Sequence, residues 1–442
     1  MLLLKNANVI HQFYPPKIKY NTDVVINNDT IVDTGKDIGK NYNAEIVLDI
    51  DNKFVSAGLV CSHNHFYSAL ARGILANIKP STDFVSILKN LWWKLDRALD
   101  EESLFYSGLI GALESIKSGT TSVVDHNASP TFITGSLSTL KKAFEQIGLR
   151  GILSYEITDR NGNEGMKEGI NESFEFINKI EEEGKKSNSK NLIEAAVGAH
   201  APFTLSDNSL KLIFDVVSKT KRGIHIHVSE DQYDSSFSHH NFGKDVLERL
   251  EDLNLLDEKS IIAHGVYLTA NDISILNEHN SFLIHNPRSN MNNGVGYMNN
   301  LYKIKNVCLG TDGIGSNMFE EIKFGYFKNA DEKEKLGMND YLNFIQNGNL
   351  LLERYFAKKF GKVEKGYTAD LVIYDYNSPT PIVDENFASH FIYGFSSRDV
   401  DTVIINGKIV YQDRKFSFDI KPIYKEAQEH AKKLWQRMNR II

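Results

Sequence analysis

The chain has 442 residues, a length that favours one large domain together with a smaller one. Its hydrophobic content of 41% and charged content of 24% are ordinary globular values, which exclude a disordered or fibrous protein. The net charge is −7 and no lysine- and arginine-rich block is present, so we expect neither a nucleic-acid partner nor binding to an anionic membrane.

The sequence predicts a cytoplasmic protein. Its N-terminal apolar run is four residues long, too short for the core of a signal peptide. No stretch approaches the roughly 18 apolar residues of a membrane span. The two cysteines, Cys61 and Cys308, lie in apolar surroundings and form no CxxC motif, so we expect buried thiols in a reducing compartment.

Strand-like segments lie at both ends of the chain. Residues 1–57 contain LLLKNANVI, NTDVVINNDTIVDTG and AEIVLDI, which are rich in β-branched residues and bounded by Asn, Asp and Gly. The same texture returns in residues 361–420, where Asn406-Gly407 predicts a hairpin turn. We therefore expect residues 1–57 and 361–420 to build one small β-sandwich domain together.

Between residues 58 and 360, short apolar runs alternate with helical stretches. The runs are AGLVCSHNH, TTSVVDH, RGILSYEI, IEAAVGAH, GIHIHVSE, SIIAHG, SFLIHN and NVCLGTDG. Eight such strands separated by helices predict an α/β fold, a TIM-like (β/α)8 barrel. In residues 421–442 the apolar positions recur every three or four residues, which predicts an amphipathic terminal helix packed on the protein itself.

Nearly every predicted barrel strand ends in a residue that can bind metal or move protons. In such barrels the active site lies at the C-terminal ends of the strands, so these side chains should converge at one mouth. The strand-end residues are His63, His65, Asp125, His126, Glu156, His200, His227, Glu230, His264, His285 and Asp312.

His63 and His65 form an HxH pair whose side chains share one side of a strand, so both imidazoles can face one ion. Alone the pair is weak evidence, because 14 histidines give roughly 0.4 such pairs by composition. A second pair, His225 and His227, is also present. The position of His63 and His65 at the end of the first barrel strand favours the metal-site interpretation.

Three later strand ends complete the candidate centre. His227 can supply a third nitrogen ligand, and Glu230 in the following turn can act as general acid and base, although a Glu at a helix entry is the alternative. Asp312 can complete a three-His, one-Asp site and accept a proton from water, or it can be a helix N-cap. His264 can polarise the substrate or hold the attacking water, or it can be an ordinary buried histidine.

Other polar residues near the strand ends offer donors and acceptors for a heterocyclic substrate. Trp92 can form an aromatic wall or lid together with Trp93, although core packing is the usual role of tryptophan. Glu156 is a candidate ligand for a second metal ion. The remaining candidates for substrate contact are His126, His200, His285, Arg288 and Asn290.

Taken in their order along the chain, the strand-end motifs resemble those of the aminohydrolase/chlorohydrolase branch of the metal-dependent amidohydrolase superfamily. The similarity runs over nearly the whole chain, through GLVCSHNH, GTTSVVDH, AHAPFTLS, HIHVSE, AHG, GTDG and KGYTADLVIYD. Three further segments are similar to the SsnA-type aminohydrolases, which are associated with selenium-linked and purine-breakdown functions: LARGILANIKPSTDFVSILKNLWWKLDRALDEE, DHNASP and HNPRSNMNNGVGYM.

The resemblance implies a mononuclear centre in which Glu230 is the proton shuttle and His264 lies beside the bound water. The ligands that it implies are His63, His65, His227 and Asp312. The chain departs from the branch at Ala57, where a proline is usual, at Ser62 and Asn64 of the metal motif, and at Asn286, where a cysteine is usual. None of these departures removes a ligand.

We therefore expect a hydrolase acting on C–N bonds other than peptide bonds, with one divalent metal ion: zinc first, with iron or manganese as alternatives. The leading reaction is deamination of a small, purine-like amino-heterocycle by metal-activated water. The alternative is hydrolytic ring opening of a cyclic amide or ureide at the same site. A non-catalytic metal-binding barrel is a third interpretation. A homo-oligomer, a dimer, is also expected.

Overall fold

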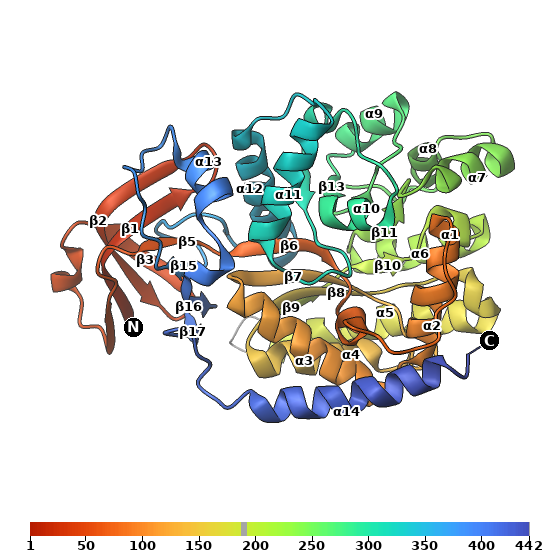
Figure 1. Ribbon diagram of the computed structural model, residues 1–442, viewed down its shortest axis with the longest axis horizontal. Coiled ribbons are helices and arrows are strands. Elements are labelled where there is room, and N and C mark those ends of the chain that lie inside the picture. The colour runs from red at the N-terminus through yellow and green to blue at the C-terminus, as the bar shows by residue number, and fades with distance from the viewer. Residues whose placement is uncertain (187–191, 442) are drawn as a thin grey trace.

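The computed structural model describes residues 1–186 and 192–441 (Figure 1). Residues 187–191, inside the expected barrel, and Ile442, at the end of the expected terminal helix, lie outside the described residues. Parallel strands with helices around them form the centre of the molecule, and a separate sheet stands at one end (Figure 1).

All eight apolar runs of the central region form strands, and every pairing among these strands is parallel. The fourth run is divided in two at Ala196. One sheet has the order β6-β7-β8-β9 and the other the order β10-β11-β12-β13-β14. The strands are β6 (Leu59–Asn64), β7 (Thr120–Asn127), β8 (Arg150–Tyr155), β9 (Ile193–Ala195), β10 (Val197–Ala199), β11 (Ile224–Val228), β12 (Ile261–His264), β13 (Phe282–His285) and β14 (Val307–Leu309).

The two parallel sheets meet at both of their edges. A parallel bridge pairs Ile157, just after β8, with Ala199 at the end of β10. A second parallel bridge pairs Asn64 of β6 with Asp312, just after β14. At this second edge the backbone N–H groups of Thr311 and Asp312 both donate to the carbonyl of His63, at 3.0 and 3.1 Å. These contacts bring the last strand of the central region beside the first.

Helices separate the strands along the chain. The longer ones are α3 (Glu101–Lys117), α4 (Ser136–Ile147), α5 (Gly162–Lys186), α6 (Asp207–Thr220), α7 (Gln232–Phe242), α8 (Val246–Asp252), α9 (Ala270–Glu278), α10 (Pro287–Asn293), α11 (Met318–Asp331) and α12 (Met338–Phe356). Asp100 caps α3 through a bond from the Ser103 N–H at 2.9 Å, and Gly119 with φ +77° follows its end.

Shorter helical segments join these elements, and three of them lie in succession before α3. These three are α1 (Phe84–Ile87), the π-helical η3 (Leu88–Trp92) and α2 (Trp93–Ala98). The remaining short segments are η1 (Ile38–Asn41), η2 (Phe66–Ala71), η4 (Asp159–Asn161), η5 (Pro202–Thr204), η6 (Leu301–Lys303), α13 (Phe387–Ser389), η7 (His390–Gly394) and η8 (Ser397–Asp399).

Both ends of the chain contribute strands to the sheet at the end of the molecule, which has the order β17-β16-β15-β5-β1-β2-β3 with β4 also paired to β1. One of its faces has an apolar core of its own, which includes Leu4, Val24, Val55, Leu371 and Ile404. The strands are β1 (Leu2–Gln12), β2 (Lys17–Asn27), β3 (Thr30–Gly35), β4 (Ile46–Asp49), β5 (Phe54–Ala57), β15 (Leu371–Tyr374), β16 (Val400–Ile405) and β17 (Lys408–Tyr411).

Gly58 connects the terminal sheet to β6, at the position where the family resemblance places Pro-Gly. A Cβ atom at residue 58 would lie 1.9 Å from Oγ1 of Thr121 on the neighbouring strand β7. The N–H of Gly58 also donates to the carbonyl of Asp370 at 2.8 Å. Glycine fits here because a Cβ atom would overlap the side chain of Thr121.

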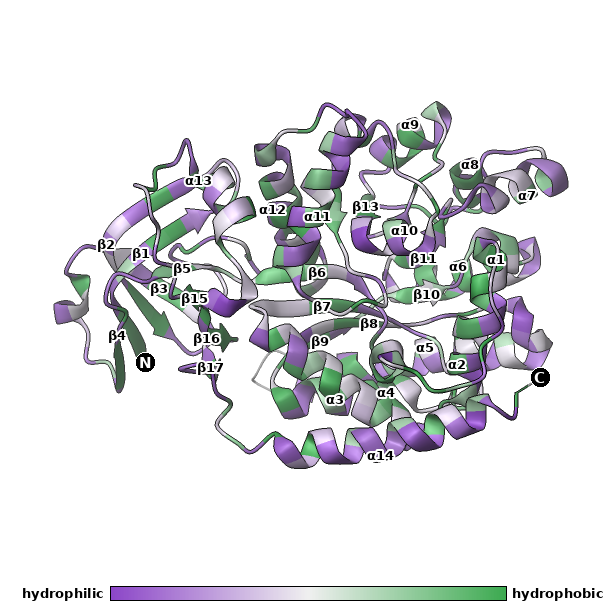
Figure 2. Ribbon diagram, viewed as in Figure 1, coloured by the Kyte–Doolittle hydropathy of each residue, from purple (hydrophilic) through white to green (hydrophobic). Residues whose placement is uncertain are grey.

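The terminal helix α14 (Lys421–Met438) runs along the molecule and packs on α3 and α2 (Figure 1). Its apolar side is buried at Ala427, Ala431, Leu434 and Met438, and Figure 2 shows hydrophilic and hydrophobic residues alternating along it. The Trp435 indole N–H donates to the carbonyl of Leu70 at 3.0 Å, which fixes the helix against η2. Within residues 1–186 and 192–441, no helix combines the length and apolarity that a membrane span requires.

Candidate metal centre and active-site pocket

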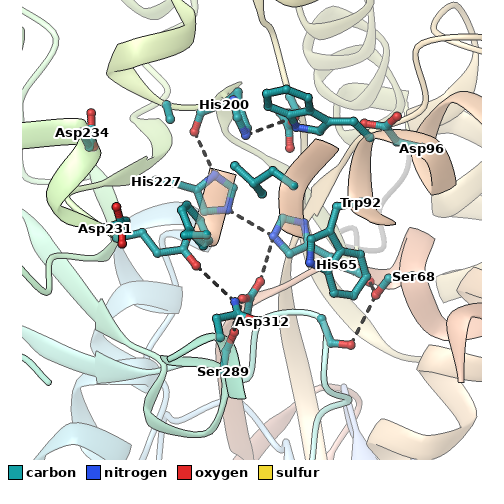
Figure 3. Close-up of a pocket in the computed structure, with 18 of the residues that line it drawn as sticks. His65, Ser68, Trp92, Asp96, His200, His227, Asp231, Asp234, Ser289 and Asp312 are labelled. Carbon is teal, nitrogen blue, oxygen red and sulfur yellow. Dashed lines mark hydrogen bonds and ion pairs between the residues drawn. The ribbon is translucent and has the colours of Figure 1, made fainter. Parts of the chain in front are cut away.

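Four side chains converge at the C-terminal ends of β6, β11 and β14. Asp312 Oδ1 lies 3.0 Å from His65 Nε2 and 3.6 Å from His63 Nε2. The Nε2 atoms of His65 and His227 are 3.1 Å apart. Figure 3 shows His65, His227 and Asp312 directed toward one another. Residues that are far apart in sequence therefore present three nitrogens and a carboxylate oxygen to one point.

His264, at the end of β12, joins this group. Ligand atoms of His63, His227, His264 and Asp312 all lie within 4.8 Å of one another. His264 is fully buried, and its Nε2 has no hydrogen-bond partner among the described residues. The imidazole is thus directed at the same point as the four converging side chains.

The hydrogen bonds at Nδ1 determine which ring nitrogen of each histidine carries the proton. His65 Nδ1 lies 2.6 Å from the carbonyl of His126, and His227 Nδ1 lies 2.8 Å from the carbonyl of His200. His264 Nδ1 lies 3.0 Å from the side-chain oxygen of Asn290. Because these oxygens can only accept, each Nδ1 donates, and each Nε2 presents a lone pair.

A chain of three hydrogen bonds gives His63 the same tautomer. Ser154 Oγ donates to the backbone carbonyl of Asp125 at 2.9 Å and accepts from His225 Nδ1 at 3.1 Å. His225 Nε2 then accepts from His63 Nδ1 at 2.8 Å. His63 Nε2 is left with a lone pair, and it is buried without a partner among the described residues.

This arrangement fits a divalent cation. Two unprotonated Nε2 atoms 3.1 Å apart, those of His65 and His227, repel each other unless a cation lies beside both. Three imidazole nitrogens and one carboxylate oxygen are the ligand types that zinc and neighbouring transition metals accept. The unpartnered Nε2 atom of His63 would be satisfied by the same ion.

The protonation equilibria also favour positive charge at this point. Burial alone would lower the pKa of His65, but the hydrogen bond and charge of Asp312 raise it to about 9, so that without an ion a proton occupies Nε2 in the place that a metal cation would take. Burial alone would raise the pKa of Asp312, but hydrogen bonds from His63 and His65 hold it well below its ordinary value. Burial lowers the pKa of His63 to about 3. Asp312 is therefore an anion that requires a neighbouring cation.

Glu230 stands beside the centre without belonging to the converging group. Its Oε2 lies 3.6 Å from His264 Nε2, and its Oε1 accepts from Asn293 Nδ2 at 3.4 Å. Burial, and then the charge of Asp312, raise the pKa of Glu230 well above its ordinary value. A protonated carboxyl at this position can donate a hydrogen bond and can later transfer that proton.

Three residues at or next to the centre adopt left-handed backbone conformations: His264 at φ 73°, Asp312 at φ 53° and Ser229, which directly precedes Glu230, at φ 49°. Each turns the chain sharply at the end of a strand, at a cost of about 1–3 kcal/mol for a residue other than glycine. The N–H of Asp312 is held by the carbonyl of His63, and Asp312 Oδ2 accepts from Ser289 Oγ at 2.5 Å. The surrounding bonds thus impose the conformation that directs the side chain inward.

The centre opens into a pocket whose wall includes His65, His227, Glu230 and Asp312. Trp92 and Trp93 also line this pocket and are only partly buried, and Trp92 packs at the same time against the main apolar core. His200, Phe203 and Tyr233 complete the aromatic part of the wall. Of the six predicted substrate contacts, His200 and Trp92 are therefore at the pocket.

The structure does not bring the other four predicted contacts to the described lining of the pocket: His126, His285, Arg288 and Asn290. Arg288 is occupied by Glu321 and Glu320, at 2.5 and 2.6 Å. Asn290 orients His264. The buried His126 supports the centre from behind, because its carbonyl accepts from His65 Nδ1 and its Nε2 donates to the carbonyl of His225. His285 is fully buried, with its ring 5.6 Å from that of Tyr297.

A cluster of Asp96, Glu156 and Arg160 was not predicted as a unit. Arg160 pairs with Asp96 and, at 3.4 Å, with Glu156, and its guanidinium lies 5.0 Å from the Trp93 ring. Asp96 lies four residues after Trp92, and this helical spacing is the signal that could have placed both on the pocket side. Glu156 also lies near His200 and His227, but Arg160 already balances its charge.

Residues 54–410 match the amidohydrolase family. The chain belongs to this family. Like the family, this amidohydrolase is a hydrolase that acts on C–N bonds other than peptide bonds. The 5-methylthioadenosine/S-adenosylhomocysteine deaminase of Thermococcus sibiricus is 32% identical to it over 416 residues, which cover 92% of this chain and 93% of the relative.

Two further comparisons agree with the family assignment. The 5'-deoxyadenosine deaminase of Methanobrevibacter smithii is 30% identical to the amidohydrolase described here and covers 98% of both chains. Among solved structures, an adenosine deaminase from Xanthomonas campestris with bound zinc superposes with a TM-score of 0.83, at 21% identity and 98% coverage of both chains. This last likeness shows that the fold is shared.

Proposed function

We propose that this amidohydrolase is a metal-dependent deaminase of purine-like substrates and that adenine nucleosides are the first to test. The observation that carries the proposal is the convergence of four Nε2 lone pairs and the Asp312 carboxylate beside a protonated Glu230. The names of the relatives support the substrate class, since they are deaminases of adenine nucleosides.

In this proposal His63, His65, His227 and Asp312 hold one divalent metal ion, with zinc as the first candidate and iron or manganese as alternatives. When bound, the metal lowers the pKa of water toward roughly 7 and so supplies a nucleophile at neutral pH. A zinc-bound relative of the same fold supports the choice of zinc.

The side chains around the ion divide the proton transfers between them. Asp312 accepts a proton from the attacking water, and the lone pair of His264 Nε2, which Asn290 holds in place, accepts a hydrogen bond that orients the water. Glu230 donates its proton to a ring nitrogen as the water oxygen adds to the carbon that bears the amine. The amine then takes the proton that Asp312 accepted, and the C–N bond breaks as the new hydroxyl group returns a proton to Glu230. Ammonia and the oxo product leave.

We also infer that the two parallel sheets form one closed (β/α)8 barrel over residues 58–360. The bridges at Ile157–Ala199 and Asn64–Asp312 support closure, because they join the sheets at both edges. The separate apolar core of the terminal sheet supports a β-sandwich from residues 1–57 and 361–420, with residues 421–442 as an appended helix. The dimer and the cytoplasmic location stay predictions.

The test is ammonia release by the metal-loaded protein from adenosine, 5'-methylthioadenosine, 5'-deoxyadenosine, guanine and cytosine. We expect turnover of at least one adenine nucleoside. Replacing Glu230 with glutamine should lower kcat about 10²- to 10⁴-fold with the metal content unchanged, because the proton donor is lost. The exposed Glu258→Gln variant is the control and should keep its activity.

Three outcomes would contradict the proposal. Absence of ammonia from every compound on a metal-loaded enzyme would remove the deaminase assignment. Loss of ring absorbance in cyclic amides or ureides without free ammonia would instead support ring opening at the same centre. A Glu230→Gln protein with normal turnover would show that the proposed proton transfer is wrong.

A further inference from the structure

The pocket wall is rich in carboxylates. Its described lining contains six of them and no lysine or arginine: Asp96, Glu156, Glu230, Asp231, Asp234 and Asp312. Asp312 is a proposed metal ligand and Glu230 lies beside it, and a bound metal cation would offset the charge there. Figure 3 shows that Asp96, Asp231 and Asp234 lie around the pocket, away from Asp312. The part of the pocket that receives the rest of the substrate is therefore acidic.

The nearest guanidinium, that of Arg160, is not available to a ligand. It lies behind the wall with 9% of its side chain exposed and is paired with both Asp96 and Glu156. It also stacks on Trp93, which does face the pocket. One cation shared by two carboxylates leaves an excess of acceptors on this side.

On the opposite side, Asp231 has no cation that lines the pocket with it among the described residues. Its carboxylate accepts from the Tyr233 N–H at 2.9 Å, and this backbone bond holds it in position. The neighbouring Asp234 accepts from the Ser229 N–H at 2.6 Å, but burial raises its pKa to about 7, so it adds little negative charge. An anionic group that entered here would lose its hydration and find the Asp231 carboxylate instead of a cation.

We infer that the pocket selects neutral or cationic amino-heterocycles and excludes those that carry a carboxylate or phosphate. The inference rests on the proposed function and narrows its substrate class. Among the compounds in the names of the relatives, 5'-methylthioadenosine and 5'-deoxyadenosine are uncharged, whereas S-adenosylhomocysteine carries a carboxylate as well as an ammonium group. The acidic wall favours the uncharged pair.

A matched pair of nucleosides tests this inference. S-adenosylhomocysteine and 5'-(3-aminopropylthio)-5'-deoxyadenosine have the same thioether tail and ammonium group and differ only in the carboxylate. We expect the metal-loaded enzyme to have a kcat/KM at least tenfold higher for the second compound. Glu156→Gln should narrow this ratio several-fold, whereas Glu182→Gln on the exposed side of α5 should leave it unchanged.

An equal or higher kcat/KM for S-adenosylhomocysteine would overturn the inference while leaving the deaminase proposal intact. If neither nucleoside reacts, charge selection is read from binding instead, and the deaminase proposal is judged on its own panel of five compounds. Trp92 and Trp93 line the pocket, so tryptophan fluorescence reports a bound ligand. Benzamidine should bind at least tenfold more tightly than benzenesulfonate, and equal or tighter binding of the sulfonate would overturn the inference.

Discussion

His225 orients a metal ligand from behind without facing the ion itself. Its ring lies between His63 Nδ1, at 2.8 Å, and Ser154 Oγ, at 3.1 Å. Metal-binding histidines commonly donate their second N–H to a carboxylate, a carbonyl or water. Here a neutral imidazole has that role, and its own remaining N–H is satisfied by a serine that is in turn bonded to the backbone.

Replacing His225 with alanine should therefore weaken metal binding by about 10- to 100-fold, since His63 loses the acceptor that fixes its tautomer. The measurement is competition with a chelator of known affinity. Glutamine at residue 225 should restore part of the affinity, because its amide oxygen can accept the same bond. If alanine and glutamine weaken binding equally at equal thermal stability, orientation by His225 is contradicted.

The predicted metal ligands follow strands in a fixed pattern, and the structure brings them together; that they bind an ion stays a prediction. The sequence cannot tell by itself why His227 faces the ion and His225 does not, since both alternate to the same side of β11. The structure supplies the reason: His225 lies one pleat deeper and meets His63 from behind. Arg288 was predicted as a substrate contact because it follows a strand end. Its carboxylate partners Glu320 and Glu321 lie on another helix, so no local pattern reveals the two ion pairs.

At the scale of elements, the turn between β11 and α7 determines where Glu230 stands. Ser229 takes a left-handed conformation there, and its N–H donates to Oδ2 of Asp234 in the first turn of α7. Oδ1 of Asp234 is buried without a partner among the described residues. The strand end, the turn and the helix start are thus joined by one carboxyl group, which is stable in its protonated form.

Asp234 should make the stability of the enzyme depend on pH. Burial raises its pKa to about 7; the neighbouring Asp272 and Asp231 also raise it, whereas the Ser229 bond and Arg249 lower it. Because this folded-state pKa lies above the ordinary value of about 3.9, the stabilisation is complete below about pH 3.9 and is lost as the pH rises through about 7.

From pH 5 to pH 8 the wild type should therefore lose about 2–3 kcal/mol of unfolding free energy relative to Asp234→Asn, which stays neutral. Urea unfolding of the metal-loaded proteins at both pH values measures the difference. The exposed Asp215→Asn variant should follow the wild type. A constant difference between wild type and Asp234→Asn across this range would show that Asp234 titrates normally.

Among the elements, the strands were predictable and the pocket wall was not. Each strand of the two parallel sheets is a short apolar run with β-branched residues, so its own sequence specifies it. The segment from α1 to α2 contains Phe84, Leu88, Trp92 and Trp93, residues that suit a core equally well. Only tertiary packing places them on a pocket wall, and the same holds for the pairing of Arg160 with Asp96.

At the scale of the whole molecule, the centre links parts of the chain that are far apart. His63 and His65 lie at the end of the first central strand, and Asp312 follows the last one. Away from this mouth, Arg150 of β8 forms a fully buried ion pair with Asp370, just before β15 of the terminal sheet. A metal ion that binds only the assembled fold should stabilise all of these contacts together.

The most direct measurement is the metal content of the purified protein and of two variants, His227→Ala and Asp312→Ala. We expect about one divalent ion per chain in the wild type, with zinc as the first candidate, and a loss of most of it in each variant because one ligand is removed. The control is His279→Ala. This histidine follows the end of α9 and pairs with Glu251, so its replacement should leave the ion in place. A wild-type protein that takes up no divalent metal, or variants that keep the full amount, would contradict the convergence of three imidazoles and an aspartate on one cation.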